Sequence, residues 1–283
     1  MIELLSRASV VASGTRRLAA AGVDQAAREA WWIWDKVSGE SQPRSCLAAE
    51  HPVDAIAAGR FEAAVLRRCA GEPLAYVLGE AAFRHQLLRS DPRALIPRPE
   101  TEGLIDLVLA KQPEGRVLDV GAGTACIALS LAWEGRYDLV VAVERSADAL
   151  ALARVNVDNT GIPVLLVRGD LSTMAGAGTF DVLVSNPPYL TQVEYDGLSP
   201  AVKEWEPKAA LAGGRDGLEA TKRLLGDGIR VLRAGGWIAL EIDGSRAHLA
   251  TELAQAAGWA EIAVFDDLFG RARYLLARRS EQS

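Results

Sequence analysis

The sequence predicts an α/β fold: a doubly wound, mostly parallel sheet of seven strands with an antiparallel last strand, preceded by a small N-terminal helical domain. Strand-like and helix-like segments alternate from Arg116 onward, which is the pattern of parallel strands joined by crossover helices. The last two strand-like segments are joined only by Asp266–Arg271, which is too short for a parallel crossover, so that pair is expected to be antiparallel. Residues 1 to about 75 show helical periodicity instead.

The N-terminal segment, residues 1–75, is expected to form a helical bundle. Glycine- and proline-containing stretches at Gly39–Pro43 and Glu50–Pro52 interrupt its helical pattern. The run Trp31–Trp34 is expected to lie in the core of the bundle, as clustered helical aromatic residues usually do, and contact with a partner protein is the alternative. The residues that recur near a 3.6-residue period are Leu18, Ala26, Ala27, Ala30, Trp31 and Trp34, and then Phe61, Ala64, Val65 and Arg68.

Residues 76–98 are expected to connect this bundle to a second domain, residues 99–283, and to contain a short β-hairpin near Ala82–Leu88. Two prolines flank Arg98 and make a stiff bend immediately before an amphipathic helix. Such a bend can form the wall of a pocket, although a plain interdomain linker would have the same composition.

The second domain begins with a strand at Arg116–Val120, a glycine-rich turn at Gly121–Ala125 and a helix from Cys126 to about Trp133. The next strand ends at Glu144. The later elements follow the same alternation, with prolines ending the strand that begins at residue 180. We expect strands at 138–143, 164–167, from 180, at 237–242, 262–265 and 273–277, and helices at about 218–232 and 247–257.

Composition indicates a soluble globular protein. Of its 283 residues, 49% are hydrophobic and 24% charged, and no stretch approaches 18 uninterrupted apolar residues. The N-terminus has an early acid and no basic segment leading into an apolar run, so a cytoplasmic location without membrane attachment is expected. A net charge of −6 argues against sequence-independent capture of nucleic acid, although a local basic patch would be compatible with it.

Neither the cysteines nor the histidines form a recognisable site. The cysteines are odd in number, widely spaced and without a CxxC pattern, which predicts reduced structural thiols. The histidines lack metal-ligand spacing, so we expect no metal. These residues are Cys46, Cys69, Cys126, His51, His85 and His248.

The sequence Asn186-Pro187-Pro188-Tyr189 follows the buried strand that begins at Phe180. The Asn186 side chain has a carbonyl acceptor, and the prolines carry carbonyls but no N–H, so this turn is rich in acceptors. Acceptors that hold both N–H bonds of a flat NH₂ group can align its poorly nucleophilic nitrogen with an electrophile, and the Tyr189 ring can pack against such a group. The alternative is that these residues only end a strand.

Acidic residues occur at three consecutive strand ends: Asp119, Glu144 and Asp170. A glycine-rich turn lets a nucleoside approach the backbone, and an acid about twenty residues further on can accept both ribose hydroxyls. Each acid alone is equally compatible with a helix cap or a solvated loop, but together they predict a nucleoside pocket. S-adenosylmethionine suits this pocket because it has no phosphate and carries positive charge.

Over nearly its whole length, the sequence resembles a known family, the PrmC/HemK protein-(glutamine-N5) methyltransferases. These enzymes methylate the glutamine of the Gly-Gly-Gln motif in peptide chain release factors. Asn-Pro-Pro-Tyr alone is shared with amino-methylating DNA enzymes, so the other segments narrow the choice. The segments that carry the resemblance are Pro73–Gly79, Pro97–Glu102, Asp119–Ala125 and Asn186–Tyr189.

The resemblance implies a SAM-methyltransferase sheet, an N-terminal domain that helps to hold the release factor, and roles for individual residues. It implies that the cofactor is held by Gly121, Ala122, Gly123, Thr124, Ala125, Glu144, Asp170, Leu171 and Asn186. The implied catalytic residues are Asn186, Pro187 and Tyr189, and the implied substrate-binding residues are Asn186, Pro187, Pro188, Tyr189, Arg98, Glu206 and Pro207, with Gly213-Gly214 after them.

One position departs from the family pattern, which has a third glycine where this chain has Ala125. Alanine is tolerable at a helix start unless the backbone requires a positive φ or a ligand atom lies against it. We therefore expect Ala125 to affect cofactor affinity and not the fold.

The resulting hypothesis is in-line transfer of a methyl group from S-adenosylmethionine to a glutamine side-chain nitrogen of a release factor, by a monomer, without a metal or a covalent intermediate. The first alternative is methylation of an exocyclic amino group in nucleic acid, but the sequence has no basic, aromatic-interleaved segment to flip and read a base. The second is a partner-binding protein with a degenerate cofactor pocket, which the alanine at position 125 suggests.

Overall fold

The structure, a computed structural model, describes residues 6–39, 51–170 and 175–281. The chain divides into two compact units. The first comprises residues 1–80 together with Pro200–Trp205, and the second comprises Ala81–Ser199 and Glu206–Ser283. Among the described residues, no helix is both long enough and apolar enough to span a bilayer.

The first unit contains helices α1 (Arg7–Ala20), α2 (Ala26–Ser38), α4 (Ala55–Cys69) and α5 (Leu74–Leu78). Local sequence fixes their ends: the Asp54 carboxylate accepts hydrogen bonds from two N–H groups in the first turn of α4, and α2 ends at Gly39 in the left-handed conformation. Apolar faces of these helices pack into one core. That core contains Val11, Leu18, Ala30, Ile33, Trp34, Phe61 and Val65.

The tryptophan run lies partly in this core, as expected. Ile33 and Trp34 are buried, and the Trp34 ring packs edge-on against Phe61 at 5.7 Å between centroids. Trp31 and Trp32 are half-buried, and the Arg28 guanidinium lies over the Trp32 ring. The surplus aromatic surface is therefore partly covered by the unit itself.

The second unit begins with the expected β-hairpin, formed by β1 and β2. The strands are Glu80–Phe83 and Gln86–Arg89, so the expected range of 82–88 contains the turn between them. Helix α6 (Pro99–Lys111) follows and begins at a proline, because the first helical residues need no N–H donor.

The main sheet of the second unit has seven strands in the order β5-β4-β3-β6-β7-β9-β8. All pairs are parallel except those made by β9, which runs antiparallel to both of its neighbours. The predicted fold class and its antiparallel last strand are thereby confirmed. The strands are β3 (Glu114–Val120), β4 (Arg136–Glu144), β5 (Leu165–Arg168), β6 (Phe180–Ser185), β7 (Leu232–Glu241), β8 (Ala260–Asp266) and β9 (Ala272–Arg278).

The prediction was wrong about where β7 begins. We expected it at Trp237, but it starts at Leu232, directly after helix α11 (Glu219–Val231). Two glycines at 235 and 236 lie in an irregular part of this strand, where the register against β6 shifts and Gly235 has a φ of 78°, the left-handed conformation that favours glycine. Gly236 is needed there because a Cβ would lie 3.0 Å from two backbone oxygens.

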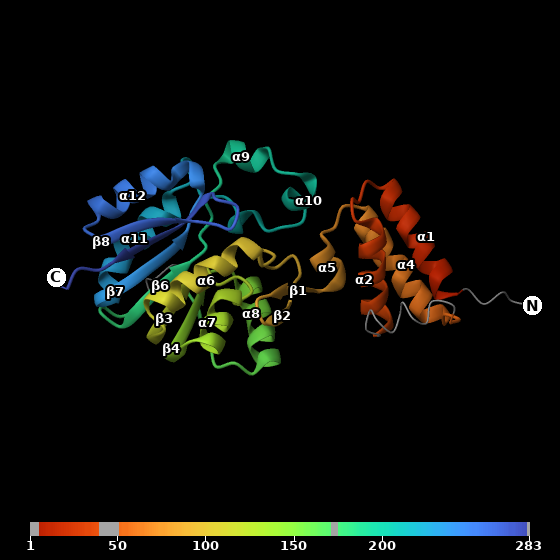
Figure 1. The fold of residues 1–283 in the computed structure, drawn as a ribbon, viewed down its shortest axis with the longest axis horizontal. Coiled ribbons are helices and arrows are strands. Elements are labelled where there is room, and N and C mark those ends of the chain that lie inside the picture. Colours follow the sequence, from red (N-terminus) through yellow and green to blue (C-terminus); the bar gives the residue numbers. More distant parts are fainter. Residues whose placement is uncertain (1–5, 40–50, 171–174, 282–283) are drawn as a thin grey trace, which may run out of the picture. The chain divides into compact units, whose positions relative to one another are not determined.

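Helices cover both faces of the sheet (Figure 1). Alternate strand residues point to opposite faces, so Val117 packs with α6, α7 (Cys126–Glu134) and α8 (Ala147–Thr160), and Leu118 packs with α11 and α12 (Ala247–Ala256). Both cores are dominated by fully buried aliphatic side chains. This packing aligns the carboxyl ends of the parallel strands at one edge of the sheet, where open α/β folds bind ligands.

Candidate active site

A pocket of about 310 Å³ opens at the carboxyl ends of β3, β4, β5 and β6. Each strand contributes the residues that directly follow it or end it, so segments far apart in sequence meet there. Of the residues predicted for the site, the pocket is lined by Gly121, Gly123, Glu144, Asp170, Asn186, Pro188, Pro207 and Gly213.

The other predicted residues do not line this pocket, and Leu171 lies outside the described residues. Ala122, Thr124 and Ala125 belong to the glycine-rich turn but are buried in the structure. Pro187 is buried, and Tyr189 is half-buried beside the pocket-lining Pro188. Arg98 and Glu206 pair with each other, as described below.

The glycine-rich turn approaches the pocket with bare backbone. Gly121 and Gly123 have φ values of 75° and 55°, which favour glycine. A Cβ built on Gly121 would meet no described atom within 4 Å, and one on Gly123 would meet only the Ala94 methyl at 4.0 Å. The turn is held in place because the N–H groups of Gly121 and Ala122 both donate to the Val143 carbonyl of β4. A ligand can therefore contact the backbone directly.

Ala125 has φ 66° and ψ 22°, the left-handed conformation, and caps helix α7 with its side chain fully buried. This is the condition under which alanine is not equivalent to glycine, and it costs about 1–2 kcal/mol. The Ala125 methyl group packs into the core under the sheet, and Ala125 does not line the pocket. The departure from glycine therefore places backbone strain in the folded protein, and its effect on cofactor affinity stays a prediction.

Glu144 is held rigidly at the end of β4. One carboxylate oxygen accepts from the Gly123 N–H at 3.0 Å, and the other accepts from the Ser146 N–H at 2.7 Å. Each oxygen retains acceptor capacity, so the carboxylate can bind the two hydroxyls of a ribose. Asp170, on the same pocket, forms a 2.9 Å ion pair with Arg223 of α11.

Of the three strand-end acids, Asp119 is the buried one. Its Oδ2 accepts from the Ala128 N–H at 3.1 Å, which anchors the first turn of α7, while Oδ1 has no hydrogen-bond partner among the described residues. Burial raises the pKa of this carboxyl to about 7. An unpartnered acidic oxygen beneath a bare-backbone turn, with a fixed carboxylate at the next strand, fits a nucleoside cofactor that carries positive charge.

The Asn186 side chain projects from the end of β6. The preceding Ser185 hydroxyl donates to the Val120 carbonyl at 2.6 Å and so ties the end of β6 to that of β3. The Asn186 NH₂ donates to the Thr101 hydroxyl at 3.1 Å, and no described residue donates to its Oδ1. The amide therefore offers a free acceptor at the pocket that it lines. Burial raises the pKa of Tyr189 to about 12, so its hydroxyl stays protonated.

The loop from Glu206 to Gly213 forms another wall of the pocket through Pro207 and small residues after it. The Glu206 carboxylate is buried and accepts from the Ile96 N–H and from the Arg98 guanidinium. Gly213 is required because a Cβ there would lie 2.6 Å from the Pro188 carbonyl oxygen. The predicted residues Arg98 and Glu206 thus support the wall, and Pro207 forms part of it.

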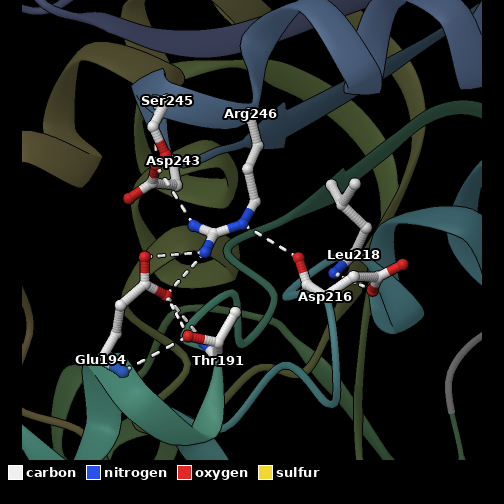
Figure 2. Close-up of polar contacts among 7 residues, drawn as sticks. All are labelled: Thr191, Glu194, Asp216, Leu218, Asp243, Ser245 and Arg246. Atoms are coloured by element: carbon white, nitrogen blue, oxygen red, sulfur yellow. Dashed lines mark hydrogen bonds and ion pairs between the residues drawn. The ribbon is translucent and has the colours of Figure 1, made fainter.

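Arg246 ties together the chain on both sides of this wall. Its guanidinium donates to both oxygens of Glu194, at 2.7 and 2.6 Å, and to the Asp216 carbonyl at 2.9 Å (Figure 2). Glu194 in turn closes a capping box with Thr191, at the start of helix α9 (Gln192–Asp196). The Arg246 guanidinium holds the pKa of Glu194 down at about 2.

Sequence reasoning missed several of these residues. Ser146 could have been found, because a serine two residues after a strand-ending acid is a typical helix N-cap, and its hydroxyl accepts from the Ala149 N–H. Arg223 and Arg246 gave no local signal, since their partners lie 30 to 53 residues away. The other missed pocket-lining residues are Arg93, Ala94, Leu95, Val143, Arg145, Ala149, Gly169, Ala212, Glu219 and Ala220.

Comparisons with known proteins agree with this geometry. Residues 9–79 match the PrmC N-terminal domain, and residues 101–199 match the methyltransferase small domain. A methyltransferase from Pyrococcus furiosus has a similar fold, with a TM-score of 0.53 and 23% identity over 77% of this chain and 98% of that one.

Two relatives are similar over almost their full lengths, and both are named release factor glutamine methyltransferase. The protein from Cereibacter sphaeroides is 38% identical over 96% of this chain and 98% of the relative. The protein from Deinococcus radiodurans is 37% identical, with 96% and 98% coverage. The chain belongs to the release factor glutamine methyltransferase family.

Proposed function

We propose that this protein transfers a methyl group from S-adenosylmethionine to the side-chain amide nitrogen (N5) of the glutamine in the Gly-Gly-Gln motif of peptide chain release factors. Family membership supports the substrate, because the relatives carry that activity in their names. The structural observation that carries the proposal is the Asn186 amide, whose NH₂ is bonded to Thr101 and whose Oδ1 is left as an acceptor at the pocket.

When bound, S-adenosylmethionine supplies an electrophilic methyl group on a sulfonium. Gly121 and Gly123 would pass close to the cofactor through bare backbone, and Glu144 would accept from its ribose hydroxyls. A cationic ligand would favour the ionised form of Asp119, whose pKa burial raises to about 7, and Asp170 adds a carboxylate whose charge Arg223 partly offsets.

Asn186 and the prolines would position the substrate. The Asn186 Oδ1 would accept one N–H of the glutamine amide, and a backbone carbonyl of the Pro187-Pro188 turn would be the second acceptor. Gripping both N–H bonds holds the nitrogen in line and stabilises the positive charge that develops on it as it attacks. The nitrogen becomes acidic once it carries the methyl group, so its proton can then pass to solvent without a dedicated base.

The first unit would hold the release factor, which is the role that the family resemblance implies for the N-terminal helical domain. We also propose that the protein acts as a monomer in the cytoplasm and binds no nucleic acid directly. Its net charge of −6 supports the last point, because phosphate binding relies on clustered positive charge.

The proposal is tested by incubating the full-length protein with S-adenosylmethionine and either a release factor or duplex DNA, followed by mass spectrometry. We expect a single added methyl group on the Gly-Gly-Gln peptide and none on DNA. Methylation of DNA, or of a release-factor residue other than that glutamine, would overturn the proposal. The absence of saturable cofactor binding would support a partner-binding protein instead.

A further inference from the structure

A chain of hydrogen bonds runs from Asn186 into the protein. The Asn186 Nδ2 donates to the Thr101 Oγ1 at 3.1 Å, and that hydroxyl donates to Glu241 Oε2 at 2.7 Å. Thr101 and Glu241 are both about 2% exposed, so water does not compete for these bonds. Only the outer end of the chain, the Asn186 amide, lines the pocket.

The fold brings the three residues together. In the parallel pairing of β6 with β7, Ser185 lies opposite Leu240, so the next residues, Asn186 and Glu241, emerge side by side at the carboxyl edge. Thr101 lies in the first turn of α6, which packs across this part of the sheet. Asn186 is 85 positions from Thr101 in the sequence, and Glu241 is 140 positions from Thr101.

The donor and acceptor of each hydrogen bond between Asn186, Thr101 and Glu241 follow from the number of protons that these side chains carry. An ionised carboxylate only accepts, so the single hydroxyl proton of Thr101 is committed to Glu241. Thr101 then presents only lone pairs to Asn186, and the amide must turn its NH₂ toward Thr101. The carbonyl oxygen is left pointing away from Thr101, toward the pocket that Asn186 lines.

We propose that Thr101 and Glu241 are positioning residues that fix the orientation of the Asn186 amide, so that its oxygen and not its NH₂ group meets the substrate nitrogen. The inference rests on the proposed function, because the orientation matters only for a substrate that donates. A flipped amide would set one NH₂ group against another and lose the acceptor that stabilises the attacking nitrogen. Misplacement of a reacting group by about 1 Å costs on the order of 100-fold in rate, so the loss of an orienting residue is expected to act on this scale.

Thr101→Val and Thr101→Ser form a matched pair of variants that tests whether the Thr101 hydroxyl orients the Asn186 amide. Valine has nearly the shape of threonine but no hydroxyl, whereas serine keeps the hydroxyl. We expect Thr101→Val to lower kcat for release-factor methylation roughly 10- to 100-fold, with the Kd for S-adenosylmethionine changed less than about threefold, and Thr101→Ser to stay within about threefold of wild type. Equal kcat in the two variants would overturn the inference.

Glu241→Gln provides a second readout that a purely structural role would not move. A glutamine, like a protonated Glu241, can donate to Thr101 and so release the constraint on the amide. Burial raises the pKa of Glu241 to about 7. The hydrogen bond from Thr101 opposes that rise most, Arg273 of β9 and Arg98 also oppose it, and Glu100 of α6 adds to it. We expect wild-type kcat to rise between about pH 6 and pH 8, and kcat of the variant to stay flat over this range, near the wild-type value at the low-pH end. A variant with the wild-type profile would contradict the inference.

An observation without substrate separates this inference from the proposed function. In NMR spectra, the Asn186 side-chain NH₂ signals can be assigned by their loss in Asn186→Ala. We expect these signals to shift in Thr101→Val and to remain near their wild-type positions in Thr101→Ser. Unchanged signals in Thr101→Val would overturn the positioning role whatever the substrate is, whereas a wild-type protein that fails to methylate a release factor would overturn only the proposed function.

Discussion

Replacing Arg246 with methionine should loosen the segment that forms one wall of the pocket. The side chain of Arg246 is 11% exposed and joins the turn before α12 to Glu194 and to the Asp216 carbonyl (Figure 2). The pocket-lining residues Pro207 to Gly213 lie between these two attachment points in sequence. Methionine keeps most of the apolar stem and removes every hydrogen bond of the guanidinium.

The size of the effect follows from the partners that are lost. The Glu194 side chain is 40% exposed, so solvent screens its ion pair, and we assign about 1 kcal/mol to it. The bond to the Asp216 carbonyl adds about 1 kcal/mol. The fourth contact, Nη1 to Asp243 at 3.3 Å, makes no aligned hydrogen bond among the described residues and adds little. The loss of about 2 kcal/mol corresponds to a decrease of roughly 4–8 °C in the Tm of the catalytic unit.

The assay is urea or thermal unfolding followed by circular dichroism, with Arg136→Met as the matched control. Arg136 pairs with Glu114 at 3.3 Å, but both side chains are more than half exposed, so its loss should change the free energy of unfolding by less than about 0.5 kcal/mol. Arg246→Met should also weaken cofactor binding several-fold. Equal stabilities of the two variants would refute the tethering role of Arg246.

Two further predictions concern buried positions. Ala125→Gly should change the free energy of unfolding by less than about 1 kcal/mol, because relief of the left-handed strain is offset by the lost methyl group and by a more flexible unfolded chain, whereas Ala125→Val should destabilise by about 2–3 kcal/mol. Denaturant titrations check both, and a strongly destabilised glycine variant would contradict this balance. Because the folded-state pKa of Glu241 is raised from 4.5 to about 7, the stabilisation from its protonation is fully present below about pH 4.5 and is lost as pH rises through 7. Wild type should therefore lose on the order of 3 kcal/mol relative to Glu241→Gln between pH 4.5 and pH 8, and parallel pH curves of the two proteins would exclude this.

Much of the fold could be predicted because its signals are local. Alternating buried strands and amphipathic helices gave the seven strands, and the short connection at Asp266–Arg271 was enough to make the last pair antiparallel. The start of β7 was missed because the strand is irregular at Gly235 and Gly236, which interrupts its extended sequence pattern. The left-handed conformation of Ala125 was considered only as a condition, since residues with a Cβ seldom adopt it and the sequence alone did not show that the turn requires it.

In the site too, residues with a local sequence signal could be predicted and their distant partners could not. Gly121, Glu144 and Asn186 were found because strand-end residues of parallel strands meet at one edge of a sheet. Partners of these residues come from elsewhere in the chain: Thr101 and Glu241 are 140 positions apart, and the bond between them depends on how α6 packs on the sheet. A single sequence contains no local pattern that reports such a pairing.

The most direct test of the account is methyl transfer by Asn186→Ala under single-turnover conditions with a release factor and saturating S-adenosylmethionine. The Asn186 oxygen is the acceptor on which the mechanism depends, so we expect the rate to fall at least roughly 100-fold while the Kd for S-adenosylmethionine stays within about threefold of wild type. A variant that transfers the methyl group at the wild-type rate would contradict the account.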